Sequence, residues 1–148
     1  MAEHTHRPTP LARAVFPHFR VITTRWMDND VYGHINNVQY YSFFDTVVNG
    51  YLVAAGALDP EKSTVIGLVV ETHCNYFSPL GFPQAIDAGL RVAQIGTSSV
   101  RYEIGLFAHE APVAAAQGHF VHVYVDRVTR RPAILPQALQ EALSALRR

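Results

Sequence analysis

Apolar and polar residues alternate along most of this chain, and the pattern predicts β-strands. Five stretches have a period of two and a composition typical of strands, and they span residues 19–25, 64–76, 85–94, 99–108 and 113–126. In the fourth stretch, four apolar side chains share one face while Arg101 and Glu103 lie on the other. The short turn before that stretch predicts a hairpin with the third one.

A different pattern marks the segment from residue 37 to about residue 55, where apolar residues recur on nearly every side of a helix. Gly56 and the nearby Pro60 are typical of a helix end. A helix that is apolar all round must be wrapped, and the only available wrapper is a curved antiparallel sheet. We therefore expect an α+β fold with one strand, a long central helix, four strands in a meander and a short helix at 138–146.

The length of 148 residues corresponds to one compact domain. We expect a loosely held N-terminal arm at residues 1–17, which hold three prolines, then a globular domain at 18–135 and a C-terminal helical segment at 136–148. Nearly half of the residues are apolar, which suffices for a sizeable core.

Charge and cysteine content narrow the classes of function. The chain has 12 basic and 12 acidic residues, a balance that argues against binding of nucleic acids or anionic membranes. A single cysteine, Cys74, excludes an intramolecular disulfide, and the polar start lacks the apolar core of a signal peptide, so we expect a cytoplasmic protein. No apolar run is long enough to span a bilayer. The eight histidines lack the spacing of a metal site, so we expect no metal or other cofactor.

The most informative part of the sequence is a polar run, residues 25–37, between the first strand and the long helix. A helix start offers unpaired N–H groups that can stabilise negative charge. The N–H groups from Gly33 to Asn37 are therefore candidate donors to an oxyanion, and Gly33 permits a tight turn and the close approach of a ligand. A carboxylate placed just before such donors predicts a hydrolytic site.

This run resembles the active-site segment of the hot-dog fold thioesterases, specifically the 4-hydroxybenzoyl-CoA thioesterase-like family. Residues 28–40, D-N-D-V-Y-G-H-I-N-N-V-Q-Y, match the family pattern D-x-D-x-x-G-H-x-N-N-x-x-Y, and residues 71–81 are similar to a family strand that ends in an aromatic residue, a proline and a glycine turn. The resemblance covers residues 19–126 and implies a hot-dog fold, a central helix wrapped by about five strands. It also implies that Asp30 is the catalytic carboxylate and that the backbone amide near Asn37 is the oxyanion donor.

Two roles for Asp30 stay open at this point. It can deprotonate water as a general base, or attack the thioester carbonyl itself and form a mixed anhydride. His34 can polarise the carbonyl or protonate the leaving thiolate, or it can brace the loop by a hydrogen bond. Asp28 is interpreted as a cap of the turn or helix.

Other residues are candidates for contacts with the substrate. Asp45 lies within the apolar helix, where the resemblance implies that it orients the site or faces a subunit interface; a solvated position is the alternative. The turn Gly96-Thr97-Ser98 lies where hot-dog proteins contact pantetheine or nucleotide. Arg130 and Arg131 can hold phosphate groups through their planar guanidinium groups, or they can belong to a solvated turn.

Together these features predict an acyl-CoA or acyl-carrier-protein thioesterase, with coenzyme A present only as part of the substrate. Two alternatives stay open: a non-catalytic module that binds acyl thioesters, and a hot-dog dehydratase or hydratase, whose histidine–acid pair is not found here. A single sheet round one helix leaves an exposed edge, and the resemblance implies sites at subunit interfaces, so we expect a homodimer or homotetramer. Nucleic acids and membranes are not expected partners.

Overall fold

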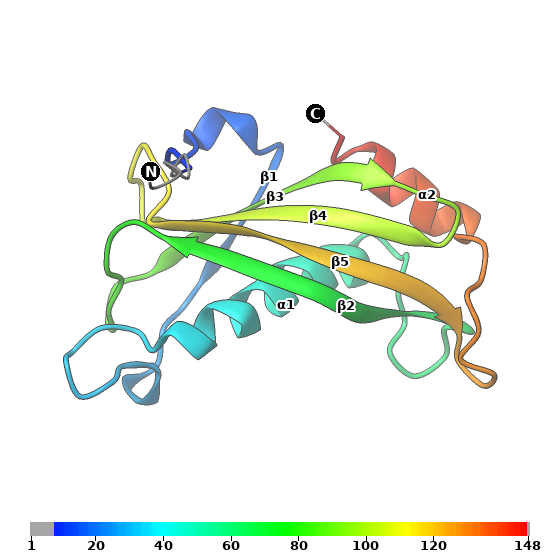
Figure 1. Cartoon of the computed structure of the whole chain (residues 1–148), viewed down its shortest axis with the longest axis horizontal. Helices are drawn as coiled ribbons and strands as arrows, with labels where there is room; N and C mark the ends of the chain where they lie inside the picture. Colours follow the sequence, from blue (N-terminus) through cyan, green and yellow to red (C-terminus); the bar gives the residue numbers. More distant parts are fainter. Residues whose placement is uncertain (1–7, 148) are drawn as a thin grey trace, which may run out of the picture.

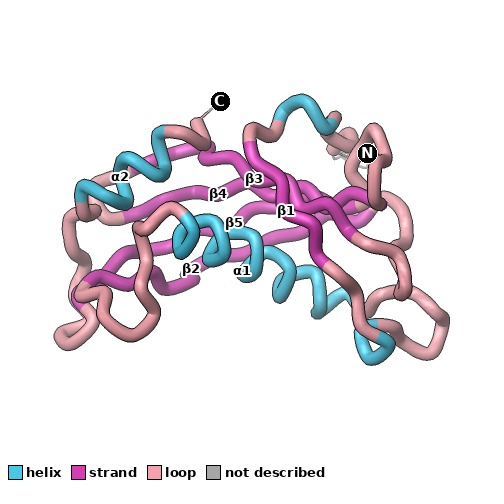
Figure 2. The backbone as a smooth tube through the Cα atoms, turned by 180° about the vertical axis from the view of Figure 1, so that it is seen from behind, coloured by secondary structure: helices cyan, strands magenta, loops and turns pink. Residues whose placement is uncertain are grey.

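One curved antiparallel sheet and one long helix dominate the structure, a computed structural model that describes residues 8–147 (Figure 1). The sheet has five strands in the order β1-β3-β4-β5-β2. Helix α1 lies across one face of the sheet, and helix α2 closes the core beside the last turns of α1 (Figure 2). The elements are η1 (Arg13–Val15), β1 (His18–Ile22), η2 (Trp26–Asp28), α1 (Asn37–Ala54), β2 (Val65–Tyr76), β3 (Ile86–Ile95), β4 (Ser99–Ala108), β5 (Ala116–Asp126) and α2 (Gln137–Ser144).

The α+β hot-dog arrangement predicted from the sequence is confirmed, and every strand and α-helix begins and ends within three residues of its predicted bounds. The first strand stops at Ile22 rather than at residue 25. It stops early because the chain turns into η2, where the Asp28 carboxylate accepts the N–H of Arg25 at 2.8 Å. Within the described part of the chain, no helix is long and apolar enough to cross a membrane.

The prediction of a four-strand meander is wrong, because only β3, β4 and β5 are consecutive neighbours in the sheet. Strand β2 pairs with β5 at one edge, and β1 pairs with β3 at the other edge. Helix α1 connects β1 to β2 along the face of the sheet, so these two strands can occupy opposite edges while the hairpins fill the space between them (Figure 1).

The core lies between α1 and the sheet, but α1 is buried on one side only. Its buried face is large and aromatic, and consists of Tyr40, Phe43, Phe44, Val47, Val48 and Leu52. Its other face is open in the single chain, where Val38 is 59% and Val53 is 47% exposed. The expectation of a helix enclosed on every side is therefore wrong for one protomer.

The segment before β1 is also held more firmly than expected. Phe16 is buried on the outer face of the sheet against Phe107, with ring centroids 5.9 Å apart. It fits there because Gly89 and Gly105 have no side chains; a Cβ on either glycine would lie 2.7 Å from the Phe16 ring. The prediction of a loosely held arm is thus wrong for residues 8–17, and the rest of that arm lies outside the described residues.

Candidate active site

The polar run after β1 folds into a closed loop that leads directly into α1. Asn29 and Ile35 form an isolated β-bridge across the loop. Inside it, the Asp30 N–H donates to the His34 carbonyl at 2.8 Å, and the Gly33 N–H donates to the Asp30 carbonyl at 3.1 Å. Gly33 has a φ of +83°, a conformation that side chains disfavour, so a glycine closes this turn at little conformational cost.

The Asp30 side chain is fixed by the loop that carries it. Its Oδ1 accepts the backbone N–H of Tyr32 at 2.8 Å and that of His34 at 3.4 Å. Its Oδ2 accepts no hydrogen bond from the described residues. Burial raises the pKa of Tyr40 in the first turn of α1, and the negative charge of Asp30 adds to this rise. The carboxylate therefore affects the ionisation of a side chain that lies in the first turn of α1.

The helix start offers one open backbone donor. Of the five N–H groups from residues 33 to 37, four are already occupied, and only the Asn37 N–H has no acceptor among residues 8–147. The four occupied amides donate as follows: Gly33 to the Asp30 carbonyl, His34 to Asp30 Oδ1, Ile35 to the Leu80 carbonyl at 2.7 Å and Asn36 to the Asp28 carbonyl at 2.9 Å. Asn37 is the first residue of α1, so its amide lies at the positive end of the helix dipole.

Residues that come later in the chain hold this loop in place. The Asn29 side chain accepts the N–H of Phe82 at 2.9 Å, which ties the loop to the segment after β2. At the end of β2, the Tyr76 hydroxyl donates to the Asn37 carbonyl at 3.1 Å. Sequence reasoning did not find these contacts, although the resemblance over residues 71–81 had marked the segment.

Asp28 supports the loop by capping the short helix η2. It is 1% exposed, and its carboxylate accepts the Arg25 N–H and, at 2.8 Å, the Arg25 guanidinium. Its carbonyl accepts the N–H of Asn36, the residue before the helix. The interpretation of Asp28 as a capping residue is confirmed.

The His34 side chain is exposed and makes no hydrogen bond or ion pair with the described residues. The loop is instead braced by backbone groups and by the side chains of Asp28, Asn29 and Asp30. Asp45 lies farther along α1, on its exposed face, and partial burial raises the pKa of its carboxyl group. Within residues 8–147, neither side chain therefore has a partner that would fix its role.

The remaining predicted contact residues lie at the other end of the molecule. The turn Gly96-Thr97-Ser98 joins β3 to β4 and is tied to the segment before α2, because the Leu135 N–H donates to the Thr97 carbonyl at 3.2 Å. Arg130 and Arg131 are in the connection from β5 to α2 and are exposed. This end lies beside the C-terminus of α1, a helix of 18 residues or about 27 Å. One chain therefore does not bring these residues to Asp30.

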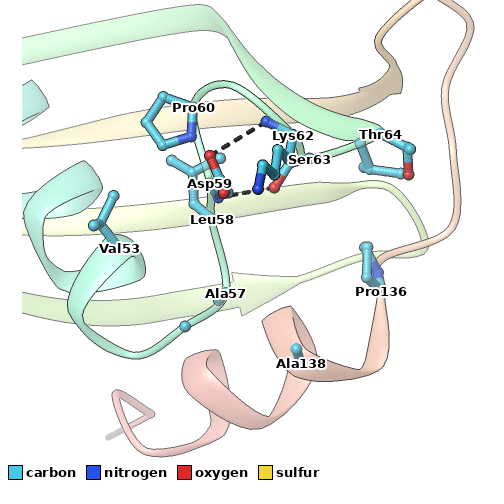
Figure 3. Close-up of a pocket in the computed structure, with 12 residues that line it drawn as sticks. Val53, Ala57, Leu58, Asp59, Pro60, Lys62, Ser63, Thr64, Pro136 and Ala138 are labelled. Atoms are coloured by element: carbon cyan, nitrogen blue, oxygen red, sulfur yellow. Dashed lines mark hydrogen bonds between the residues drawn. The ribbon is translucent and has the colours of Figure 1, made fainter.

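Several open hollows mark the surface of the fold. A polar hollow of about 370 Å³ lies beside the loop, between β1 and α1, and both Arg20 and Arg25 line it. A larger groove of about 740 Å³ lies past the end of α1, between the connection to β2 and the start of α2 (Figure 3). In the described residues, no group of three or more histidine, cysteine or acidic side chains is arranged to hold a metal ion.

Known proteins share both this fold and its sequence pattern. A sequence model described as the Thioesterase-like superfamily matches residues 24–143. The solved structure of the PA5185 protein from Pseudomonas aeruginosa strain PAO1 is 53% identical, covers 94% of this chain and 97% of that one, and has a TM-score of 0.92. Slr0204, a 1,4-dihydroxy-2-naphthoyl-CoA thioesterase from Synechocystis, shares the fold with a TM-score of 0.77 at 17% identity, over 85% of this chain and 94% of its own.

A curated relative, the uncharacterized protein YsmA of Bacillus subtilis (strain 168), is 24% identical over 85 residues. The match covers 57% of this chain and 57% of YsmA, so the chain spans little more than half the length of that relative.

Proposed function

This chain belongs to the Thioesterase-like superfamily, and from that membership we propose that it hydrolyses an acyl-CoA or acyl-carrier-protein thioester to a free acid and a thiol. The single observation that carries the proposal is the pairing of one carboxylate with one open amide. Asp30 is fixed in a closed loop, and among residues 8–147 one of its carboxylate oxygens accepts no hydrogen bond, while the Asn37 N–H at the start of α1 has no acceptor.

The proposed reaction uses these two groups in sequence. Asp30 takes a proton from water, which attacks the thioester carbon, or its own oxygen attacks that carbon and water then opens the anhydride. In both routes the carbonyl oxygen becomes an oxyanion, and the Asn37 N–H stabilises it together with the helix dipole. The C–S bond then breaks, and the thiolate leaves and takes up a proton. In this proposal that proton comes from His34, an exposed residue of the same loop.

A second protomer completes the proposed site. The candidate phosphate-binding residues Arg130 and Arg131 lie near the C-terminal end of α1, about one helix length from the loop of Asp30 in the same chain, so in this proposal they hold the nucleotide of a thioester bound at the partner's loop. Antiparallel pairing of the open edge of β2 with the same edge of a partner would bring each far end toward the other protomer's loop. Apolar side chains along that edge support such pairing, since Val69 is 46% and Val70 is 60% exposed.

An assay of thiol release tests the proposal. The panel contains short, long and aromatic acyl-CoAs, including 1,4-dihydroxy-2-naphthoyl-CoA, because a protein that shares this fold acts on that thioester. We expect Asp30→Asn and Asp30→Ala to lower kcat by about 100-fold or more, because both variants remove the base or nucleophile. The matched control Glu141→Gln removes an exposed carboxylate on α2 and should retain full activity.

Two other outcomes would contradict the proposal. Saturable binding of the acyl-CoAs without release of thiol, unchanged in Asp30→Asn, would indicate a non-catalytic binding module. Hydration of an enoyl-CoA without thiol release would indicate a hydratase.

A further inference from the structure

A histidine is buried in the core near the far end of the molecule, away from Asp30. His122 on β5 is 3% exposed, and neither of its ring nitrogens has a hydrogen-bond partner among the described residues. Rings of Tyr102 and Tyr124 pack against it, with centroids 5.2 and 5.9 Å away. On the neighbouring strand β2, Gly67 leaves room for the imidazole, since a Cβ there would lie 2.8 Å from Nδ1. A buried polar side chain without a partner is unusual and calls for an explanation.

The imidazole lines a small, partly enclosed cavity. This cavity has a volume of about 20 Å³, which is room for one small polar group. It adjoins the open groove of about 740 Å³ that Figure 3 shows past the end of α1. Four residues line both the cavity and the groove: Ala57, Leu58, Val65 and Pro136. A molecule seated in the groove can therefore extend one group toward the histidine.

The chemistry of the cavity selects the kind of group that fits. Burial lowers the pKa of His122 to about 4, so the ring is neutral near pH 7 and offers one donor and one acceptor nitrogen. The hydroxyls of Tyr102 and Tyr124 are hydrogen-bonded to each other at 2.6 Å. The other walls are mostly apolar, with Leu52 and Leu139 among them. An ion would lose its hydration here without a counter-charge, whereas a hydroxyl can both donate and accept.

We propose that this cavity and its groove form a second ligand site, which takes a neutral molecule with an apolar body and one hydroxyl group. The hydroxyl meets His122, and the body lies along the groove against Val53, Leu58 and Pro136. The hydroxyl would satisfy the imidazole, which has no partner among the described residues, and the apolar body would cover the apolar wall of the groove. Both effects favour this occupant. The site lies near the C-terminal end of α1, so it is separate from the loop that carries Asp30.

Titration with para-propylphenol tests the proposal, with propylbenzene as the matched probe that lacks the hydroxyl. Calorimetry measures the affinity, and the side-chain nitrogen resonances of His122 report on its hydrogen bonds. We expect one saturable site per chain, a shift of those resonances, and binding of propylbenzene about tenfold weaker, since one buried hydrogen bond is lost.

Variants make the test specific. His122→Leu should weaken para-propylphenol binding about tenfold, while His122→Gln, which keeps a donor and an acceptor, should retain most of the affinity. Leu58→Trp should block the entrance, and Val113→Trp, an exposed position away from the groove, should not. Equal binding of both probes, or unchanged binding in both His122→Leu and Leu58→Trp, would overturn the proposal. So would a crystal structure soaked with the phenol that shows only a water on His122.

Discussion

At the scale of single residues, the proposed oxyanion donor is a main-chain amide, and most substitutions leave it in place. Proline is the exception, because it has no N–H. Asn37 is the first residue of α1, a position that proline favours, and Asn36 before it has φ −59° and ψ 136°, which a following proline tolerates. Asn37→Pro should therefore remove the donor while the helix still forms.

We expect Asn37→Pro to lower kcat by about 100-fold, in line with the loss of one oxyanion donor in other hydrolases. Asn37→Ala keeps the N–H and should lose far less, which separates the amide from its side chain. Kinetics of thiol release give the comparison, and circular dichroism confirms that the variant is folded. Equal kcat in the proline and alanine variants would exclude this amide as the donor.

His122 also predicts a pH dependence of stability. Its pKa is about 4 in the folded protein and about 6.5 when unfolded, so the unfolded state binds more protons between these values and stability falls as the pH falls through them. Between pH 7.5 and 4.5 this group should lower the free energy of unfolding by about 2.5 kcal/mol. Urea unfolding of wild type and His122→Gln at both pH values measures the difference. Parallel loss of stability in the two proteins would contradict a neutral, buried imidazole.

At the scale of elements, the segment before β1 is fastened to β3 by one carboxylate. Asp87, 5% exposed, accepts from Arg13 at 2.8 Å, from His109 at 2.9 Å and from the Glu110 N–H at 2.9 Å. Burial alone would raise the pKa of Asp87, but these bonds hold it below its ordinary value, and the Asp87 charge raises the pKa of His109. The Arg13–Asp87 ion pair therefore joins the segment before β1 to strand β3 by charge as well as by packing.

Asp87→Asn should lower the free energy of unfolding by about 2 kcal/mol, because charged hydrogen bonds are lost from a buried site. The stabilisation by Asp87 is present above its unfolded pKa and lost as the pH falls through its lowered folded pKa. The part that depends on charged His109 is present below its unfolded pKa and lost as the pH rises through its raised folded pKa. The difference between wild type and variant should thus be largest at about pH 4 to 6.5, the interval between those two unfolded values. Urea titrations across this range test it; a difference that does not vary with pH would contradict the charge pairing.

The elements themselves could be predicted because their signals are local. Alternation along β4 and the apolar run of α1 gave bounds within three residues. The order of the strands in the sheet could not be predicted. The pairing of β2 with β5 depends on contacts between residues far apart in the chain, which no local pattern encodes. For the same reason the sequence predicts a loose arm around Phe16. The space that receives its ring exists because Gly89 and Gly105, far away in the chain, have no side chains.

The candidate site likewise has a part that the sequence predicts and a part that depends on the whole fold. Asp30, Gly33 and Asn37 lie within one short run, so the sequence could indicate them together. The support from Tyr76 and Phe82 comes from a distant segment; the resemblance marks residues 71–81, but no sequence pattern predicts their contacts with the loop. The separation of Arg130 from Asp30 could not be predicted from the sequence either, because it depends on the whole fold.

At the scale of the whole molecule, a site shared between two protomers predicts complementation between two inactive variants. An Asp30→Asn protomer lacks the proposed base or nucleophile, and an Arg130→Glu, Arg131→Glu protomer lacks the proposed phosphate contacts. Each variant alone should be nearly inactive. In a hybrid dimer, one of the two sites receives an intact loop from one protomer and intact arginines from the other, so the hybrid should have about half of the wild-type activity.

Co-expression with two different affinity tags isolates the hybrid, and light scattering after gel filtration gives the assembly state. A hybrid as inactive as its parents would show that the arginines act within their own chain, whereas full activity of the arginine variant alone would show that they take no part. A monomeric wild type with full activity would show that the site needs no partner. The proposed role of Asp30 would then rest on the Asp30→Asn and Asp30→Ala variants alone.

The seat of Phe16 also bears on how the chain acquires its shape during synthesis. Phe16 leaves the ribosome before the strands that receive it, because β3 and β4 follow much later in the chain. Until both hairpin strands have emerged and paired, this aromatic ring has no native place to go and is open to chaperones or to other nascent chains. The outer layer of the sheet is therefore started by the earliest described residues and finished only after β4 has emerged.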